Sequence, residues 1–259
     1  MDITKTALLR IFGSCIASIT LVASLSAQAL VTDRPDATES SSVVGTGVFQ
    51  LETGFLFVEE DSTDTLESFG TLLRIGLSNH FEARIAWDGH IDIGSSGPDG
   101  IGDAELGFKY FLQKEDGTRP EAALIVHTSV PVGDDAFTTD ASDPSFLLSF
   151  AHTTSESTSL GYNIGASLET MEDGFGGETT LASLDYSMAF GFDVAERVGG
   201  YIEIFGSQGL SADGDPIHLD GGFTYLLDDD TQFDFFVGAG LNDDAPDWFV
   251  GIGFAKRWR

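Results

Sequence analysis

Charged side chains recur at every second position inside otherwise apolar segments of this sequence. Glu82 and Arg84 alternate with the apolar residues around them. Glu105 and Lys109 share the same spacing parity in a later segment. Period-two spacing places such charges on one face of a β-strand, and the apolar residues on the other.

Charges that face a protein interior require partners. The spacing therefore predicts either a paired network that holds an interior together or a charged constriction that selects solutes. The inward-facing candidates are Glu52, Arg74, Glu82, Arg84, Asp103, Glu105, Lys109, Glu121, Glu203, Asp234 and Arg257.

The histidines do not build a recognisable catalytic motif. His127 and His218 share the inward spacing and could act as hydrogen-bonding groups or bases, but no Ser or paired Asp beside them completes a nucleophile arrangement. Asp213-Gly214-Asp215 lacks the regular spacing of a cation-binding loop. We therefore expect no enzyme, no cofactor and no metal site.

The composition excludes two classes of protein. The 259 residues contain 12 Lys and Arg against 42 Asp and Glu, a net charge of −30, which excludes a nucleic-acid-binding protein because phosphates demand clustered cations. Aromatic residues make up 11% of the chain, which excludes a disordered acidic polypeptide.

The N-terminus has the pattern of a secretory signal. Lys5 and Arg10 precede an apolar run, and Ala27-Gln28-Ala29 supplies the small residues of a cleavage site. The sequence predicts a signal peptide over residues 1–29, with a retained membrane helix as the alternative. Cys15, the only cysteine, lies within it.

Residues 30–45 lack strand alternation and contain a proline. We interpret them as a segment folded into the periplasmic end of a lumen, with Arg34 against lumen acids and Asp33 or Asp36 against Arg84 or Lys109. A disordered tail is the alternative.

Residues 46–259 repeat the period-two pattern about twelve times, in segments of roughly ten residues that are long enough to cross a bilayer at a tilt. The predicted fold is all-β, an antiparallel transmembrane β-barrel of about twelve strands. A soluble sandwich is the alternative, although such strands would be long for one. Short turns alternate with six connections predicted as outer loops, residues 59–67, 90–102, 132–143, 169–178, 208–216 and 242–247.

The six predicted outer loops hold 20 Asp and Glu residues and no Lys or Arg. One interpretation is solvated, salt-adapted loops. The other is a mouth that concentrates cations through a focused field, for which the candidates are Asp134, Asp135, Asp243 and Asp244.

Several short motifs are similar to those of a known family. They are Thr32-Asp33-Arg34-Pro35-Asp36, Phe49 to Gly54, Gly102 to Gly107, Val130-Pro131-Val132-Gly133 and Trp248-Phe249-Val250-Gly251. In these the chain resembles a bacterial outer-membrane family of transporters, also called the MetA-pathway of phenol degradation family. The resemblance covers nearly all of residues 30–259.

The resemblance implies a porin-like barrel in the outer membrane of a Gram-negative bacterium. Its implied function is passive uptake of small organic compounds, including aromatic or hydrophobic ones. The implied partners are outer-membrane lipid, lipopolysaccharide, small organic solutes and the barrel assembly machinery. A plugged structural or adhesive barrel is the first alternative, and a barrel enzyme is the second.

Overall fold

The computed structural model describes residues 29–94, 96–172, 177–210 and 214–259. The predicted signal peptide therefore lies outside the described residues, apart from its last position. Within the described ranges there is no helix of the length and apolarity needed to cross a membrane.

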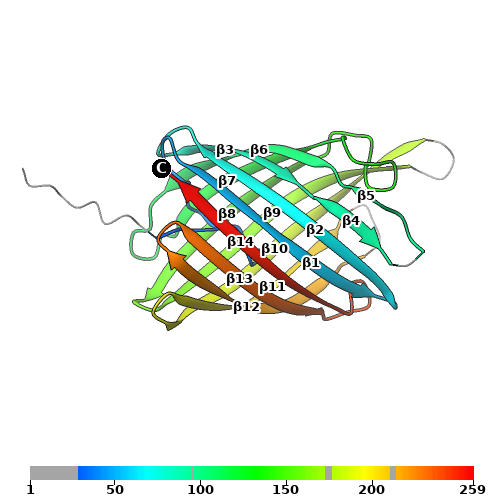
Figure 1. The fold of residues 1–259 in the computed structure, drawn as a ribbon. Helices are drawn as coiled ribbons and strands as arrows, with labels where there is room; N and C mark the ends of the chain where they lie inside the picture. The colour runs from blue at the N-terminus through cyan, green and yellow to red at the C-terminus, as the bar shows by residue number, and fades with distance from the viewer. Residues whose placement is uncertain (1–28, 95, 173–176, 211–213) are drawn as a thin grey trace, which may run out of the picture.

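Twelve strands form a closed antiparallel ring, in the order β1-β2-β3-β6-β7-β8-β9-β10-β11-β12-β13-β14 and back to β1 (Figure 1). β1 and β14 close it in continuous register from Phe49↔Trp258 to Glu59↔Trp248. Two further short strands, β4 and β5, form a hairpin that continues β3 beside β2. The strands are β1 Phe49–Glu60, β2 Thr63–Gly76, β3 Phe81–Trp87, β4 His90–Ile93, β5 Asp99–Ile101, β6 Ala104–Gln113, β7 Glu121–Val130, β8 Pro144–Ser155, β9 Thr158–Glu172, β10 Glu178–Ala195, β11 Val198–Gly209, β12 Ile217–Asp228, β13 Thr231–Gly240 and β14 Trp248–Trp258.

The barrel is apolar outside and polar inside, the reverse of a soluble protein. In β13, Phe233, Phe235 and Val237 are exposed, while Gln232 and Asp234 are buried. This alternation matches a wall between lipid and a polar lumen. The predicted all-β barrel of about twelve strands is confirmed.

Three predicted outer loops are wrong in extent. Residues 59–67 are not a loop, because β1 and β2 continue as a hairpin to a tight turn at Asp61 and Ser62, both with positive φ. The β-branched residues Thr63 and Thr65 suit a paired strand, which explains why the ladder persists. Residues 90–102 contain the β4–β5 hairpin. In the predicted loop 169–178, residues 169–172 belong to β9 and residue 178 begins β10.

Connections at the two ends of the barrel differ, and we name the ends accordingly. The turn end carries the short connections, such as residues 156–157, 196–197 and 229–230, together with the C-terminus (Figure 1). The loop end carries the longer ones, such as 131–143 and 241–247.

Candidate functional site

The N-terminal segment, residues 30–45, enters the barrel at the turn end and runs inside it. Leu30 N donates to Asp229 O at the β12–β13 turn. Farther along, the Thr38 hydroxyl forms a hydrogen bond with that of Ser187 in β10. Ser41 Oγ donates a hydrogen bond to Glu121 of β7, and Val44 N donates one to Glu82 of β3. The segment thus contacts walls on opposite sides of the lumen.

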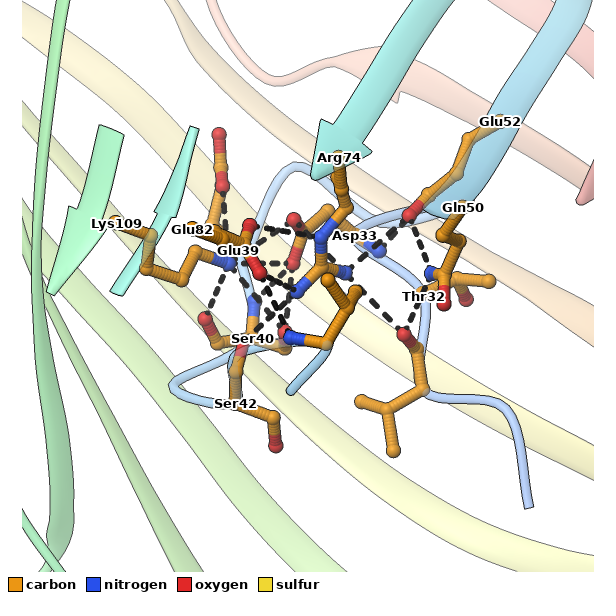
Figure 2. A network of polar contacts seen from close by, with 12 residues as sticks. Thr32, Asp33, Glu39, Ser40, Ser42, Gln50, Glu52, Arg74, Glu82 and Lys109 are labelled. Carbon is orange, nitrogen blue, oxygen red and sulfur yellow. Dashed lines mark hydrogen bonds and ion pairs between the residues drawn. The ribbon is translucent and has the colours of Figure 1, made fainter. Parts of the chain in front are cut away.

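Asp33 is the centre of a buried charge network (Figure 2). Its carboxylate lies 2.6 Å from Arg84 Nη1, 2.9 Å from Lys109 Nζ and 3.2 Å from Arg74 Nη1. Burial alone would raise the pKa of Asp33, but the three cations outweigh it and hold that pKa well below the usual range. Asp33 is therefore ionised, and its ion pairs join the N-terminal segment to β2, β3 and β6.

Acids on the wall complete the network. Glu82 lies 2.9 Å from Arg74 Nε, and Glu52 lies 3.3 Å from Arg74 Nη1. Glu52 Oε2 also accepts the backbone N–H groups of Asp33 and Arg34. Glu39 of the N-terminal segment lies 2.7 Å from Arg84 Nη2. Four acids thus surround three cations. We call these seven residues the charge network: Asp33, Glu39, Glu52, Arg74, Glu82, Arg84 and Lys109.

Arg34 points away from this network. Its Nη2 lies 3.3 Å from Asp234 Oδ1, and its guanidinium lies 5.8 Å from the centre of the Phe236 ring. Gly54 and Gly253, paired across β1 and β14, make room for it, since a Cβ at either would lie 2.5 Å from Arg34 Nη2.

Asp36, three residues after Asp33, has a contrasting environment. Burial and the neighbouring carboxylates of Glu203 and Asp220 raise its pKa well above the usual range. In the described part of the chain, Asp36 forms no ion pair with Arg84 or Lys109, both of which pair with Asp33. The same acidic wall holds Ala37, whose N–H donates to Glu203 Oε2 at 2.7 Å.

His127 connects the charge network to Glu105. Its Nδ1 lies 3.0 Å from Glu105 Oε2, and its Nε2 accepts from Arg84 Nε at 2.8 Å. An accepting Nε2 requires a neutral ring with its proton on Nδ1, so Glu105 orients the histidine and the histidine orients Arg84.

Three other predicted inward residues lie outside the charge network. Asp103 accepts the backbone N–H groups of Val132 and Gly133 and so shapes a connection at the loop end. Glu121 accepts from Ser41. Arg257 lies at the turn end, where its Nε donates to Asp230 at 2.8 Å.

The four mouth candidates, Asp134, Asp135, Asp243 and Asp244, are exposed at the loop end. Asp134 Oδ2 accepts the N–H of Ile101, and Asp244 Oδ2 accepts the N–H of Asp215. Among the described residues no group of His, Cys, Asp and Glu is arranged to hold a metal ion.

Sequence reasoning missed an aromatic cluster inside the barrel. Tyr201, Phe236 and Phe249 are buried together, and Phe205 packs against them. Phe205 stacks on His218, with ring centres 4.5 Å apart. The available signal was two adjacent aromatic pairs, Phe235-Phe236 and Trp248-Phe249, because neighbouring strand residues must face opposite sides.

Two cavities lie beside the N-terminal segment. One, of about 440 Å³ at the turn end, is lined by Arg34, Asp36 and Tyr201 among others. The other, of about 310 Å³ toward the loop end, is lined by Ala37, Leu147, Phe205 and His218 among others. The lumen thus retains space next to the segment.

Comparisons with known proteins identify a family and a fold. The sequence pattern of a family described as "Putative MetA-pathway of phenol degradation" matches residues 32–258. No curated protein matches the chain.

Similar solved structures are membrane barrels. An outer-membrane channel from Pseudomonas putida F1 has a TM-score of 0.65 at 11% identity, covering 84% of this chain and 98% of that one. The NanC porin has a TM-score of 0.58 at 8% identity, covering 80% and 98%. The transport unit of the autotransporter AIDA-I from Escherichia coli has a TM-score of 0.50 at 9% identity, covering 83% and 91%. At these identities the likeness establishes the fold alone.

Proposed function

The chain belongs to this MetA-pathway of phenol degradation family, and from that premise we propose that it is a porin-like transporter of the Gram-negative outer membrane. It admits small organic solutes passively, including aromatic or hydrophobic ones. Outer-membrane lipid and lipopolysaccharide surround it, and the barrel assembly machinery inserts it. The turn end faces the periplasm, as short turns do in such barrels.

The observation that carries this proposal is the space left inside a closed barrel. Both lumen cavities combine hydrogen-bonding groups with aromatic or aliphatic side chains, Tyr201 in one and Leu147 and Phe205 in the other. Sites for small organic molecules combine apolar walls with a few placed polar groups.

Planar-bilayer recording of the purified, refolded chain tests the proposal. We expect discrete openings, since a solute pathway also admits ions. A correctly folded barrel that shows no openings would instead support the plugged structural barrel, which the close hydrogen bonding of the N-terminal segment favours. Growth of a deletion strain on aromatic and aliphatic carbon sources would identify the solute class.

The acidic mouth predicts cation preference that depends on salt. At about 0.01 M salt the Debye length is roughly 30 Å and the loop acids act together, whereas at about 1 M it is roughly 3 Å. We expect cation-selective reversal potentials that fade as ionic strength rises. Replacing Asp134, Asp135, Asp243 and Asp244 by Asn weakens them and leaves the barrel folded, because an amide oxygen still accepts the backbone N–H groups. Anion selectivity at low salt would contradict the prediction and assign selectivity to Arg84, Lys109 and Arg257.

A further inference from the structure

The two lumen cavities lie against the same stretch of wall. The turn-end cavity is lined by Pro35 and Asp36 and by residues of β8 to β13. The loop-end cavity is lined by Ala37 and by residues of β8 to β12, so the two cavities share these five strands. Residues 35–38, which we call the strap, therefore separate one cavity from the other.

On the opposite side of the lumen the charge network is closely packed, and a third cavity of about 370 Å³, lined by Asp88, Asp103 and Glu105 among others, lies on its loop-end side. The side chains of Arg74, Glu82 and Lys109 are fully buried, and that of Arg84 is nearly so. Such a paired network leaves a solute no room, and opening it would leave charges without partners. A passage along β1, β2, β3 and β6 is therefore the less favourable one.

Neutral donors attach the strap to its wall. Thr38 Oγ1 donates to Glu203 and lies 2.8 Å from Ser187 Oγ. Among the described residues no ion pair joins residues 35–38 to the barrel, whereas Asp33 and Glu39 on either side are both ion-paired. A Cβ at Gly161 would lie 3.1 Å from Thr38 Cγ2, so the strap rests directly on bare backbone.

We propose that solutes cross along β8–β11 and that Thr38, Ser187 and Glu203 form a latch that opens to join the two cavities. This inference rests on the proposed transport function. The strap moves while the charge network stays in place, because the strap has the weaker attachment.

The acids of this route define a solute class. Asp185 and Glu203 line it or its latch, and the cation that lines it, Arg34, is paired with Asp234. Unpaired acids repel anions and accept hydrogen bonds. The route therefore favours neutral or cationic solutes with hydrogen-bond donors over carboxylates.

A disulfide across the latch tests the route. The Thr38 and Ser187 hydroxyl oxygens are 2.8 Å apart, so T38C/S187C places two sulfurs within reach of the roughly 2.05 Å bond. The matched control is T53C/T71C, whose hydroxyls are 3.0 Å apart on the lipid-facing side of β1 and β2. Thiol labelling verifies oxidation in both variants, and heat-modified gel migration verifies the barrel.

We expect oxidised T38C/S187C to lose the wild-type conductance and to regain it on reduction, while oxidised T53C/T71C conducts like wild type. Equal conductance of oxidised T38C/S187C and wild type would overturn the route but leave the transport proposal standing. A silent wild type would overturn the transport proposal and the route together.

Liposome swelling tests the solute class. We expect E203Q to raise the entry rate of a sugar carboxylate relative to the neutral sugar, because it removes a charge from the latch. The control E196Q removes an acid that is exposed in the β10–β11 turn, outside the route, and leaves the ratio unchanged. An unchanged ratio in E203Q would overturn the assigned solute class.

Discussion

Deleting residues 30–45 raises the single-channel conductance while the barrel still folds. The segment occupies the lumen, but every hydrogen bond that closes the ring joins strand to strand, from β1–β2 round to β14–β1. Arg74 keeps Glu52 and Glu82 as partners, and Arg84 keeps Glu82. Lys109 loses its partners Asp33 and Glu39 with the segment, and water that enters the emptied lumen solvates it. Planar-bilayer recording measures the change.

Heat-modified migration of the deletion variant is the control for folding. A folded deletion variant with wild-type conductance would mean that the segment does not limit passage. A lower conductance would mean that the segment holds the lumen open.

Replacing Asp33 by Ala lowers the free energy of unfolding by about 3–5 kcal/mol, the range for breaking a buried ion pair by removing one partner. The loss is large because Arg74, Arg84 and Lys109 all lose a contact within 3.2 Å while the rest of the segment keeps water out. Denaturant unfolding in lipid vesicles, followed by tryptophan fluorescence, measures it.

Asp36→Ala is the matched control, with the opposite expectation. It removes an acid from beside Glu203 and Asp220, so stability is unchanged or higher at neutral pH. Equal losses in the two variants would contradict the assignment of Asp33 as the anchoring residue.

The two aspartates also differ in the sign of their pH dependence. The pKa of Asp33 is depressed in the fold, so its stabilisation is present above the ordinary aspartate pKa and is lost as pH falls through the depressed value. The pKa of Asp36 is raised, so its penalty is absent in acid and develops as pH rises from the ordinary value to the raised one. The stability deficit of Asp33→Ala therefore persists from neutral pH into mild acid.

The strand pattern could be predicted from the sequence because alternation is a local property. A residue's side of the wall follows from its parity in the strand. Parity thus assigned Glu82, Arg84 and Lys109 to the lumen, where all three are buried. Parity did not give the extent of the connections 59–67, 90–102 and 169–178, where strands continue into residues whose acidic composition is typical of a loop.

Local pattern could not separate Asp33 from Asp36. Both precede the first strand, both lie within two residues of Pro35, and neither belongs to a strand or a helix. Which one meets Arg84 depends on the path of the segment through the lumen, and that path depends on wall residues up to 200 positions away, such as Asp234 beside Arg34.

The sequence by itself determined an antiparallel barrel, its apolar outer face and the charges of its inner face, because these depend on period-two spacing. The tertiary structure alone decided which charges pair, where Tyr201, Phe236 and Phe249 gather, and which side of the lumen keeps its space. Those features depend on the register and closure of twelve strands, which bring distant residues to one depth of the lumen. Spacing along a single strand carries no information about that depth.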